Sequence, residues 1–474
     1  MRRSTTLAFA LILVAADLSS CAATDPPPPP TTTPWRPGTI LPAEGEVGRG
    51  LVDVRGLVHA HSVYSHDACD GEPVLPDGNI DGTCFDDFRR GLCQSRHDFV
   101  FLTDHGDRFT ETAFPDVLLY RPDRGDVLVE RGGRPVANRI LCDDGRNVLV
   151  MAGSENGLMP VGIEAHVEDD ATVRASVYGA RDQASADRLR EAGAIVLLAH
   201  PEDFSVDELR ALPVDGFEMY NLHRNTLLGG GFALDILLRA NAGEPGLLHP
   251  DLLVFAIVSE DPDYLERWGR VLAGGKRLTT TMGTDCHRNT FRTIMEDGER
   301  GDSYRRMMLS FSNHLLVRPA AANGIIDDAD LKEALRAGRL FGVFEMYGHP
   351  VGLDMVATKD GASFEMGDEV PAGATIRVTT PTVRDLDPAA EPPRLVTRVL
   401  RAVDDVEGFI EVGRSEGGVL EVVAAEPGVY RAEVRIMPWH LREHLGFDDV
   451  RLLDEADLAD TDYVWIYGNP FYVR

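Results

Sequence analysis

Lysine is scarce in this sequence, which has only Lys276, Lys332 and Lys359 among its 474 residues. Arginine does not make up the difference, because 77 acidic side chains stand against 47 basic ones and leave a formal net charge of −30. A surface that binds nucleic acid needs clustered lysine and arginine to displace counterions from the phosphates. The composition therefore predicts no nucleic-acid partner.

Long apolar runs are also missing. The longest covers residues 7–16, which is ten residues, whereas a membrane-spanning helix needs about 20 apolar residues. Arg2 and Arg3 precede this run, and the segment LSSC (residues 18–21) follows it. Charged, apolar and small residues in this order are typical of an export signal. We therefore expect residues 1–20 to be a signal peptide.

The LSSC segment resembles a bacterial lipobox, whose cysteine is lipidated and becomes the first residue of the mature protein. The resemblance implies lipidation at Cys21 and attachment to a membrane of the cell envelope. Neither Ala22 nor Ala23 is the aspartate that retains lipoproteins at the inner membrane of Gram-negative cells, so the outer membrane is favoured. The alternative is ordinary cleavage and a soluble secreted protein.

Residues 21–50 are expected to be the lipidated cysteine and a tether. They include five consecutive prolines, residues 26–30, followed by TTTP. This composition favours extended polyproline II and supplies no apolar core. The folded part is therefore expected to begin near residue 51.

The chain has six cysteines, and five remain if Cys21 is lipidated. An exported chain allows disulfides, but an odd number leaves at least one cysteine unpaired. Cys286 is the expected free cysteine, because it lies between Asp285 and His287, two candidate metal ligands described below. The spacing does not determine how the other four pair.

From about residue 51 short apolar runs end repeatedly at a histidine, aspartate or glutamate. The runs are LVDVRGLVHAH to His61, FVFLTDH to His105, VLVMAGSE to Glu155, AIVLLAHP at His200 and LTTTMGTDCH to His287. Helix-like stretches, such as residues 183–191 and 262–272, lie between several of them. Alternating strands and helices predict a parallel sheet, and an α/β barrel would collect the polar strand ends at one face.

His59 and His61 alternate along a strand, so their imidazoles lie on the same face and suit Zn, Mn or Fe. A single histidine at a strand end is more commonly a hydrogen-bonded structural residue. The repetition of such residues at successive strand ends favours the metal-binding interpretation.

At these motifs the sequence resembles the PHP family, named for polymerase and histidinol phosphatase. The matching motifs are HAHSVYSHD (residues 59–67), TDH (103–105), GSE ending at Glu155, a histidine at His166, AHP (199–201) and GTDCH (283–287). The resemblance implies an α/β fold, namely a distorted seven-stranded (β/α) barrel over residues 51–347. Its last helix-like stretch is at residues 331–345. Among exported members it is most similar to the carbaryl-hydrolase-like metallohydrolases.

The resemblance also implies two or three divalent metal ions. The ligands carried over from the family are His59, His61, Asp67, His105, Glu155, His166, His200, Asp285 and His287. His66 is an alternative to Asp67 for the third position. The competing amidohydrolase superfamily commonly bridges its metals with a carboxylated lysine, and no lysine lies between His61 and His200. Amidohydrolase variants with glutamate as the bridge remain open.

Such a centre predicts hydrolysis, because clustered cations generate hydroxide near neutral pH and neutralise charge on a phosphoryl or acyl oxygen. We expect a phosphoesterase in which a hydroxide bridging the metals attacks a small-molecule phosphate ester. Asp285 and His105 are the candidate catalytic residues, with Asp285 as proton acceptor. Two alternatives remain, namely an esterase or amidase using the same site, and a non-catalytic binding lipoprotein that contains metal.

The tetrapeptide HRNT occurs at residues 223–226 and again at 287–290. Arg224 and Arg288 are therefore candidate substrate-binding residues, because a guanidinium can chelate phosphate or carboxylate. The alternative is that both arginines pair with acidic residues in loops.

Asp77, Asn79 and Asp81 are spaced like the first half of a calcium loop, although its twelfth position is Phe88 instead of glutamate. A calcium site and a disulfide-stapled polar loop are both open interpretations of this segment.

After Gly348 the pattern changes to strand-like runs separated by turn residues, from VGLDMVAT (residues 351–358) to DYVWIYGNPFYVR (462–474). These spacings predict a β-sandwich over residues 348–474.

Overall fold

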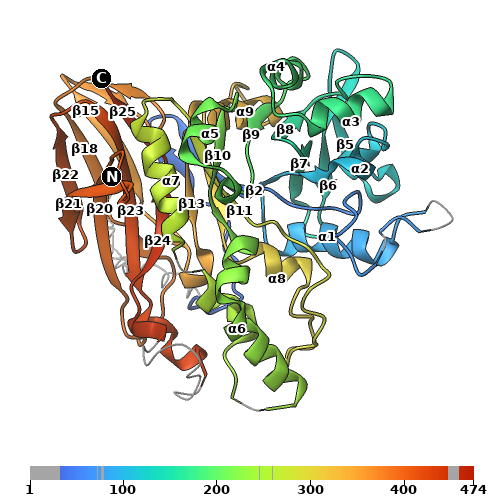
Figure 1. Ribbon diagram of the computed structural model, residues 1–474. Coiled ribbons are helices and arrows are strands. Elements are labelled where there is room, and N and C mark those ends of the chain that lie inside the picture. The colour runs from blue at the N-terminus through green and yellow to red at the C-terminus, as the bar shows by residue number, and fades with distance from the viewer. Residues whose placement is uncertain (1–32, 72, 76–78, 245, 259, 447–457) are drawn as a thin grey trace, which may run out of the picture.

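The computed structural model describes residues 33–71, 73–75, 79–244, 246–258, 260–446 and 458–474 (Figure 1). The predicted signal peptide, Cys21 and Asp77 lie outside these ranges. Within them, no helix combines the length and the apolar character that crossing a membrane requires. The described chain is a mixed α/β structure with one large sheet.

Neighbouring strands can be followed around a circuit in the first part of the chain. They are β2 (Leu51–Val58), β3 (Phe99–Phe101), β7 (Asn147–Glu155), β8 (Met159–Ile163), β9 (Ile195–Leu197), β10 (Gly216–Asn221) and β11 (Thr279–Gly283). Ladders join β2 to β3, β3 to β7, β7 to β8, β8 to β9, and β10 to β11. Between β9 and β10 the Leu198 amide donates to the Gly216 carbonyl. An isolated β-bridge between Ala60 and Cys286 connects the residues that follow β2 with those that follow β11.

The circuit departs from simple alternation at β8, which pairs antiparallel with both β7 and β9. Only residues 156–158 separate β7 from β8. This connection is too short for a crossover helix and makes a hairpin instead. Further strands flank the circuit: β1 (Gly45–Gly48), β4 (Asp104–His105), β5 (Val127–Arg131), β6 (Arg134–Leu141) and β12 (Ser312–Val317).

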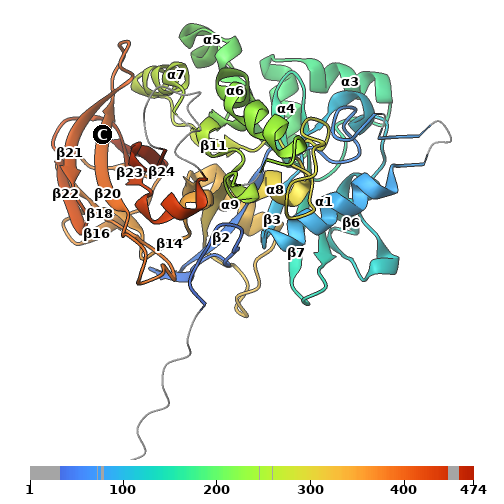
Figure 2. The same cartoon turned by 90° about the horizontal axis from the view of Figure 1, so that it is seen from below.

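The described helices pack around these strands (Figures 1 and 2). They are α1 (Gly82–Gln94), α2 (Gly106–Phe109), α3 (Ala171–Gly179), α4 (Gln183–Glu191), α5 (Val206–Ala211), α6 (Leu222–Asn241), α7 (Pro262–Ala273), α8 (Tyr304–Met308) and α9 (Asp328–Ala337). The two helices expected at residues 183–191 and 262–272 are present as α4 and α7. Asp182 and Asp261 cap their N-termini by accepting backbone N–H groups.

The helix-like stretch at residues 331–345 is only partly helical. Helix α9 ends at Ala337, because Gly338 adopts a left-handed φ of 77° that stops the helix. The chain then enters β13 (Leu340–Val343), which pairs with β12.

The tail after Gly348 is rich in strands, seen in orange and red at the left of Figure 1. An antiparallel sheet contains β16 (Ala362–Phe364), β15 (Asp354–Lys359), β18 (Ala374–Thr379) and β22 (Val419–Ala424). Other strands are β14 (Pro350–Val351), β17 (Glu369–Val370), β19 (Thr382–Val383), β20 (Arg394–Ala402), β21 (Phe409–Ser415), β23 (Gly428–Met437), β24 (Tyr463–Gly468) and β25 (Phe471–Val473).

The boundary expected between residues 347 and 348 does not separate two sheets. Strand β24 pairs antiparallel with β13, with Tyr467 opposite Gly342, so the sheet of the tail continues into the first part of the chain. Helix α7 also packs on the tail, where the guanidinium of Arg431 lies 4.2 Å from the Trp268 ring and 4.3 Å from the Phe409 ring. The tail is therefore joined to the first part through shared strands and a shared core.

Two disulfides, Cys69–Cys84 and Cys93–Cys142, tie the two ends of α1 to the loop after β2 and the end of β6. Cys286 is free and buried, which confirms the prediction that it is the unpaired cysteine. Burial raises the pKa of its thiol to about 12, so it stays protonated at neutral pH.

Candidate metal centre

Eight of the nine predicted ligands converge at the chain ends of β2, β3, β7, β9 and β11. These eight are His59, His61, Asp67, His105, Glu155, His200, Asp285 and His287. Seven of them form two adjacent groups that share His61, and the eighth, His200, lies beside the first group with Nε2 3.1 Å from Oε1 of Glu155. The first group is His59, His61, Glu155 and Asp285, and the second is His61, Asp67, His105 and His287; within each, the ligand atoms lie within 4.8 Å of one another.

The first group has the dimensions of a metal site. Nε2 of His59 lies 3.1 Å from Nε2 of His61, and each of these atoms lies 3.2 Å from Oε2 of Glu155. Oδ1 of Asp285 completes the group at 3.4 and 3.1 Å from the two imidazole nitrogens. Bonds of about 2.0–2.2 Å to a tetrahedral ion place ligand atoms about 3.3–3.6 Å apart. The separations therefore fit four ligands around one cation with little movement.

The second group surrounds the carboxylate of Asp67. Its Oδ2 lies 3.1 Å from Nε2 of His105 and 3.3 Å from Nε2 of His287. His66 instead stacks its ring on that of His105, with ring centroids 4.9 Å apart. Of the two alternatives for the third position, the structure thus brings Asp67 into the group.

Five histidines of the centre turn Nδ1 outward to an oxygen acceptor. The acceptors are Glu218 for His59 at 2.6 Å, Ser65 for His61 at 2.9 Å, the Glu155 carbonyl for His105 at 3.3 Å, Glu202 for His200 at 3.1 Å and the Asp285 carbonyl for His287 at 2.7 Å. These bonds hold the proton on Nδ1, so each Nε2 directs a lone pair inward. Nε2 of His287 is buried and finds no hydrogen-bond partner among the described residues. Inward lone pairs facing carboxylate oxygens fit a bound cation.

The electrostatics also favour positive charge at the centre. Burial opposes protonation of His59, but the carboxylates of Glu218, Asp285 and Glu155 outweigh this and hold the pKa of His59 well above its ordinary value. Conversely, burial favours the neutral form of Asp285, yet the adjacent histidines, His59 first, hold its pKa well below the ordinary range. Protons and metal cations would compete for the same lone pairs.

Three of these ligands adopt an unusual backbone conformation. His59, His200 and Asp285 have φ values of 104°, 51° and 47°. Residues with a side chain rarely adopt positive φ, and such strain is commonly found at functional sites. Gly283, the first residue of the GTDCH motif, has no room for a side chain, because a Cβ there would lie 2.0 Å from Oε1 of Glu218.

Two residues of the centre were not predicted. Glu218, on β10, is fully buried and orients His59. His223, at the start of α6, places Nδ1 3.3 Å from Oδ2 of Asp285 and forms a further group with Asp285 and His287. Its side chain is 53% exposed, so it stands at the rim. The first HRNT copy and the strand-like GFEMYN before it were the signals that could have indicated both residues.

His166 lies outside these groups and is a correction to the predicted ligand set. Its Nε2 bonds the Thr112 carbonyl at 2.7 Å, and its Nδ1 lies 3.3 Å from the Tyr178 hydroxyl. Its ring packs edge-on against Phe109 and Phe114. The loop after the β7–β8 hairpin thus places His166 in an aromatic pocket, where burial lowers its pKa.

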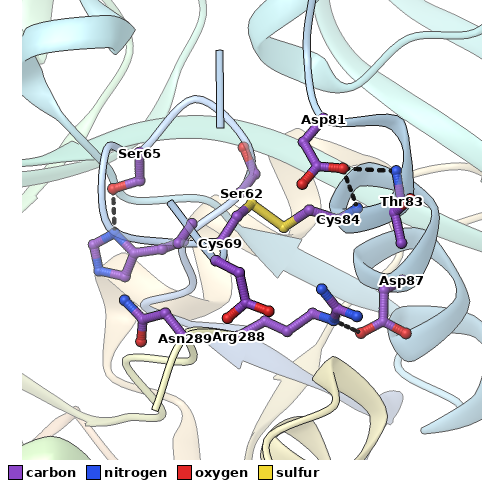
Figure 3. Close-up of a disulfide and its surroundings, with 12 residues drawn as sticks. Ser62, Ser65, Cys69, Asp81, Thr83, Cys84, Asp87, Arg288 and Asn289 are labelled. Atoms are coloured by element: carbon purple, nitrogen blue, oxygen red, sulfur yellow. Dashed lines mark hydrogen bonds and ion pairs between the residues drawn. A yellow bond between two sulfur atoms is a disulfide. The ribbon is translucent and has the colours of Figure 1, made fainter. Parts of the chain in front are cut away.

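The two candidate substrate-binding arginines pair with acids. Nε of Arg288 lies 2.8 Å from Oδ2 of Asp87 on α1 (Figure 3), and Nε of Arg224 lies 3.3 Å from Oδ2 of Asp261. The structure therefore supports the ion-pair alternative for both.

In the candidate calcium segment, the Asp81 carboxylate caps α1 by accepting from the Thr83 and Cys84 amides (Figure 3). A calcium site there stays a prediction, since Asp77 lies outside the described residues.

No protein-family model matches this chain, and no curated protein is similar to it. Among solved structures it is similar to a two-domain protein from Bacteroides vulgatus, described as containing a predicted PHP-like metal-dependent phosphoesterase. The identity is 12%, the TM-score is 0.31, and the match covers 90% of this chain and 98% of the other.

Proposed function

We propose that the protein is a metal-dependent hydrolase with two adjacent divalent cations, and that its substrates are phosphoric esters. The observation that carries this proposal is the pair of ligand groups sharing His61, in which every histidine Nδ1 is turned outward. His59, His61, Glu155 and Asp285 would hold one cation. Asp67, His105 and His287 would hold the other. His61 lies in both groups and would be a ligand of one cation or the other. Zn, Mn and Fe all suit such mixed nitrogen and oxygen ligands.

When bound, the cations would supply an activated water and would neutralise charge that develops on the ester during hydrolysis. The chain itself orients the ligands. Glu218 and Glu202 fix the rings of His59 and His200, as partner carboxylates commonly do for metal-ligating histidines. Asp285 and His105 remain the proposed catalytic residues, and His223 stands beside Asp285 at the rim, where a substrate would enter.

The charge of the centre favours an anionic substrate. Asp67, Glu155 and Asp285 are the three carboxylates of the ligand groups, and their ion pairs are with histidines only among the described residues. Glu218 and Glu202 lie behind the rings of His59 and His200, so two divalent cations would exceed the negative charge of the ligand groups themselves. A phosphate ester is therefore favoured over a neutral carboxylic ester or amide, although the same ligands could hydrolyse either.

We further propose that the circuit of strands from β2 to β11 is a distorted barrel of the PHP type. The support is the order of the motifs along the chain and their convergence at one set of strand ends. The β-rich tail would then cover one side of this barrel through the β13–β24 ladder.

The protein is also proposed to be exported and lipid-anchored through Cys21, with the outer membrane favoured. The basic, apolar and LSSC segments of residues 2–21 support export. Two disulfides among the described residues support it as well, because disulfides persist in oxidising compartments. Mass spectrometry of the N-terminal peptide tests the anchor; a mature N-terminus other than a diacylglyceryl-modified Cys21 would contradict it.

The test of function is metal content together with hydrolysis of a phosphomonoester, a phosphodiester and a carboxylic ester by the purified mature protein. About two metal ions per chain and phosphoester turnover are expected. Both should be lost in a His59→Ala, His61→Ala double variant. The matched control is His444→Ala, which removes a half-buried histidine outside the ligand groups and should change neither quantity.

Turnover of the carboxylic ester alone would move the assignment to an esterase. Bound metal without turnover of any panel member would favour the non-catalytic binding protein. A protein that binds no metal under these conditions would contradict the ligand assignment itself.

A further inference from the structure

We propose that the Cys69–Cys84 disulfide positions Asp67, and that the second ligand group retains its cation only while this disulfide is intact. The inference rests on the metal centre proposed above and adds a redox dependence to one of its two groups. Asp67 is separated from Cys69 by a single residue, and Cys84 is on the first turn of α1. The disulfide therefore joins a ligand-bearing loop to a helix (Figure 3).

The loop after β2 lacks regular secondary structure over residues 61–71 and is held by individual bonds. The Tyr304 hydroxyl lies 2.9 Å from the His61 carbonyl and 3.0 Å from the Ala68 carbonyl, and the Arg288 amide donates to the same Ala68 oxygen at 2.8 Å. The side chain of Asn289 donates to the Asp67 carbonyl. These bonds come from the segment at residues 288–304, and Asp104 and His105 hold Ser62 and Ser65 nearer the start of the loop.

Helix α1 supplies the support on the other side. Cys69 and Cys84 are both buried, and the disulfide between them is a covalent link from the loop to the helix. Asp87, one turn further along α1, pairs with Arg288 at 2.8 Å and thus ties the helix to the 288–304 segment as well. The loop consequently lies between α1 and the 288–304 segment, and the Asp87–Arg288 pair joins these two supports to each other.

Asp67 depends on this support more than the other ligands do. Within residues 61–71, His61 is the first residue and Asp67 lies in the middle of the loop, whereas His59, Glu155 and Asp285 lie at or close to strand ends. Its Oδ2 lies between His105 and His287, and its Oδ1 accepts from the Ser65 hydroxyl in the same loop. Release of the loop from α1 would therefore disturb the second group and leave the first group in place.

The redox step is ordinary disulfide reduction. A phosphine attacks one sulfur and breaks the S–S bond, which gives a phosphonium on that sulfur and a thiolate on the other. Water then attacks the phosphorus, so the phosphine leaves as phosphine oxide; the disulfide has taken two electrons from the phosphine, and two protons from water complete the two thiols. In an oxidising compartment the disulfide persists, and in a reducing one it does not. The second cation would accordingly be retained only after export.

The experiment compares two full-length double variants, Cys69→Ser with Cys84→Ser and Cys93→Ser with Cys142→Ser. The second pair is the matched control, because among the described residues no hydrogen bond or disulfide joins Cys93 or Cys142 to the Asp67 loop, and their disulfide closes a longer segment, 49 residues against 15. Loop-closure entropy makes loss of the longer crosslink at least as destabilising. A general loss of stability would thus affect the control as much or more.

Zinc affinity is measured by titration, with metal content after dialysis as a second readout. Removal of a residue that positions a ligand typically weakens metal binding 10- to 100-fold. We expect that loss for the second zinc in the Cys69→Ser, Cys84→Ser variant, with the first zinc unchanged, and two tightly bound zinc ions in the control. Equal weakening in both variants, or two tight sites in both, overturns the inference. Absence of zinc from the wild type as well would instead contradict the proposed metal centre.

If the Cys69→Ser, Cys84→Ser protein does not fold, the control variant supplies the test, since Cys69–Cys84 is its remaining disulfide. Treatment with a phosphine should add two free thiols, those of Cys69 and Cys84, while the second zinc is released, and reoxidation should restore that zinc. Two tight zinc sites in the fully reduced, folded protein overturn the inference.

Discussion

Two buried clusters of charged side chains differ in how their charges are balanced. In the tail, Glu433 is buried among Arg398, Arg431 and Arg435, and Nη1 of Arg431 lies 2.8 Å from its Oε2. Arg435 in turn pairs with Glu260 at 2.7 Å. In the metal centre, histidines are the only ion-pair partners of Asp67, Glu155 and Asp285 among the described residues, and all of them except His223 direct Nε2 at one of these carboxylates.

The difference separates a structural cluster from a binding cluster. Arginine carries a permanent charge, so the Glu433 cluster is complete without a ligand. Histidine with its proton on Nδ1 is neutral, so the carboxylates of the centre lack compensation until a cation or additional protons arrive. Perturbing the centre should therefore change metal binding and turnover, and perturbing the tail cluster should change stability.

The largest effect is expected for Asp285→Ala, because Asp285 contacts His59, His61, His200 and His223. Loss of metal-assisted catalysis removes several kcal/mol of transition-state stabilisation, which is at least about a thousand-fold in kcat/KM. Kinetics and metal content on the same sample check this. Wild-type turnover with full metal content would contradict the assignment of Asp285.

Glu433→Ala should instead destabilise the fold by about 3–5 kcal/mol, because it leaves buried arginines without a counter-charge. Metal content at saturating zinc should be unchanged. Urea unfolding measures the change. The control is Glu426→Ala, whose side chain is 70% exposed and pairs with Arg401, and an exposed pair of this kind contributes under about 1 kcal/mol. Similar destabilisation by both variants would show that Glu433 contributes no more to stability than an exposed ion pair does.

Glu218→Gln tests the support of a ligand rather than the ligand. The variant keeps the shape of the side chain but weakens the acceptor that holds the proton of His59 on Nδ1. Metal affinity should fall about 10- to 100-fold. The loss should be confined to the cation held by the first ligand group, because Glu218 orients His59. Calorimetric titration measures it. The control is Glu421→Gln, an exposed change on β22 that should leave affinity unaltered. Equal affinity in Glu218→Gln and the wild type would show that Glu218 does not tune the site.

Much of the centre was predictable because strand ends carry their chemistry in short motifs. His59, His61, Glu155, His200, Asp285 and His287 each directly follow or end an apolar run, and the pattern placed them together without knowledge of the loops. His166 failed this logic, because it follows a hairpin and no spacing rule fixes where the subsequent loop goes. Glu218 was hidden inside a strand, where alternation alone does not distinguish a supporting carboxylate from any other buried residue.

The fold was predictable to the same degree. Alternating runs indicated an α/β architecture, but β8 reverses direction because its connection to β7 is short, and the sheet crosses the expected boundary through the β13–β24 ladder. The β13–β24 pairing is set by contacts between segments more than 100 residues apart in the chain, which local patterns do not contain. The same reason applies to the partner of Arg288, Asp87, and the partner of Arg224 lies 37 residues away on a different element.

A third buried cluster gives the smallest expected effect and tests whether a histidine can serve the structural role. Nδ1 of His314 lies 2.8 Å from Oδ1 of Asp53, and its Nε2 lies 3.2 Å from Oε1 of Glu345, which also pairs with Arg55. Burial opposes protonation of His314, but Asp53 and then Glu345 outweigh it and raise its pKa from 6.5 to about 9. Both ring nitrogens of His314 face carboxylates, as those of His59 do, and here the protonated ring together with Arg55 completes the cluster.

A histidine whose pKa is raised on folding stabilises the protein fully below its unfolded pKa of 6.5 and loses that contribution as the pH rises through about 9. Between pH 7 and pH 9 the loss is on the order of 2 kcal/mol. The free energy of unfolding of the wild type should therefore fall across this window more steeply than that of His314→Gln, measured by urea unfolding at each pH with metal removed from both proteins. Parallel curves would show that His314 is neutral in the folded state, so that Asp53 and Glu345 would then have to be balanced by Arg55 alone.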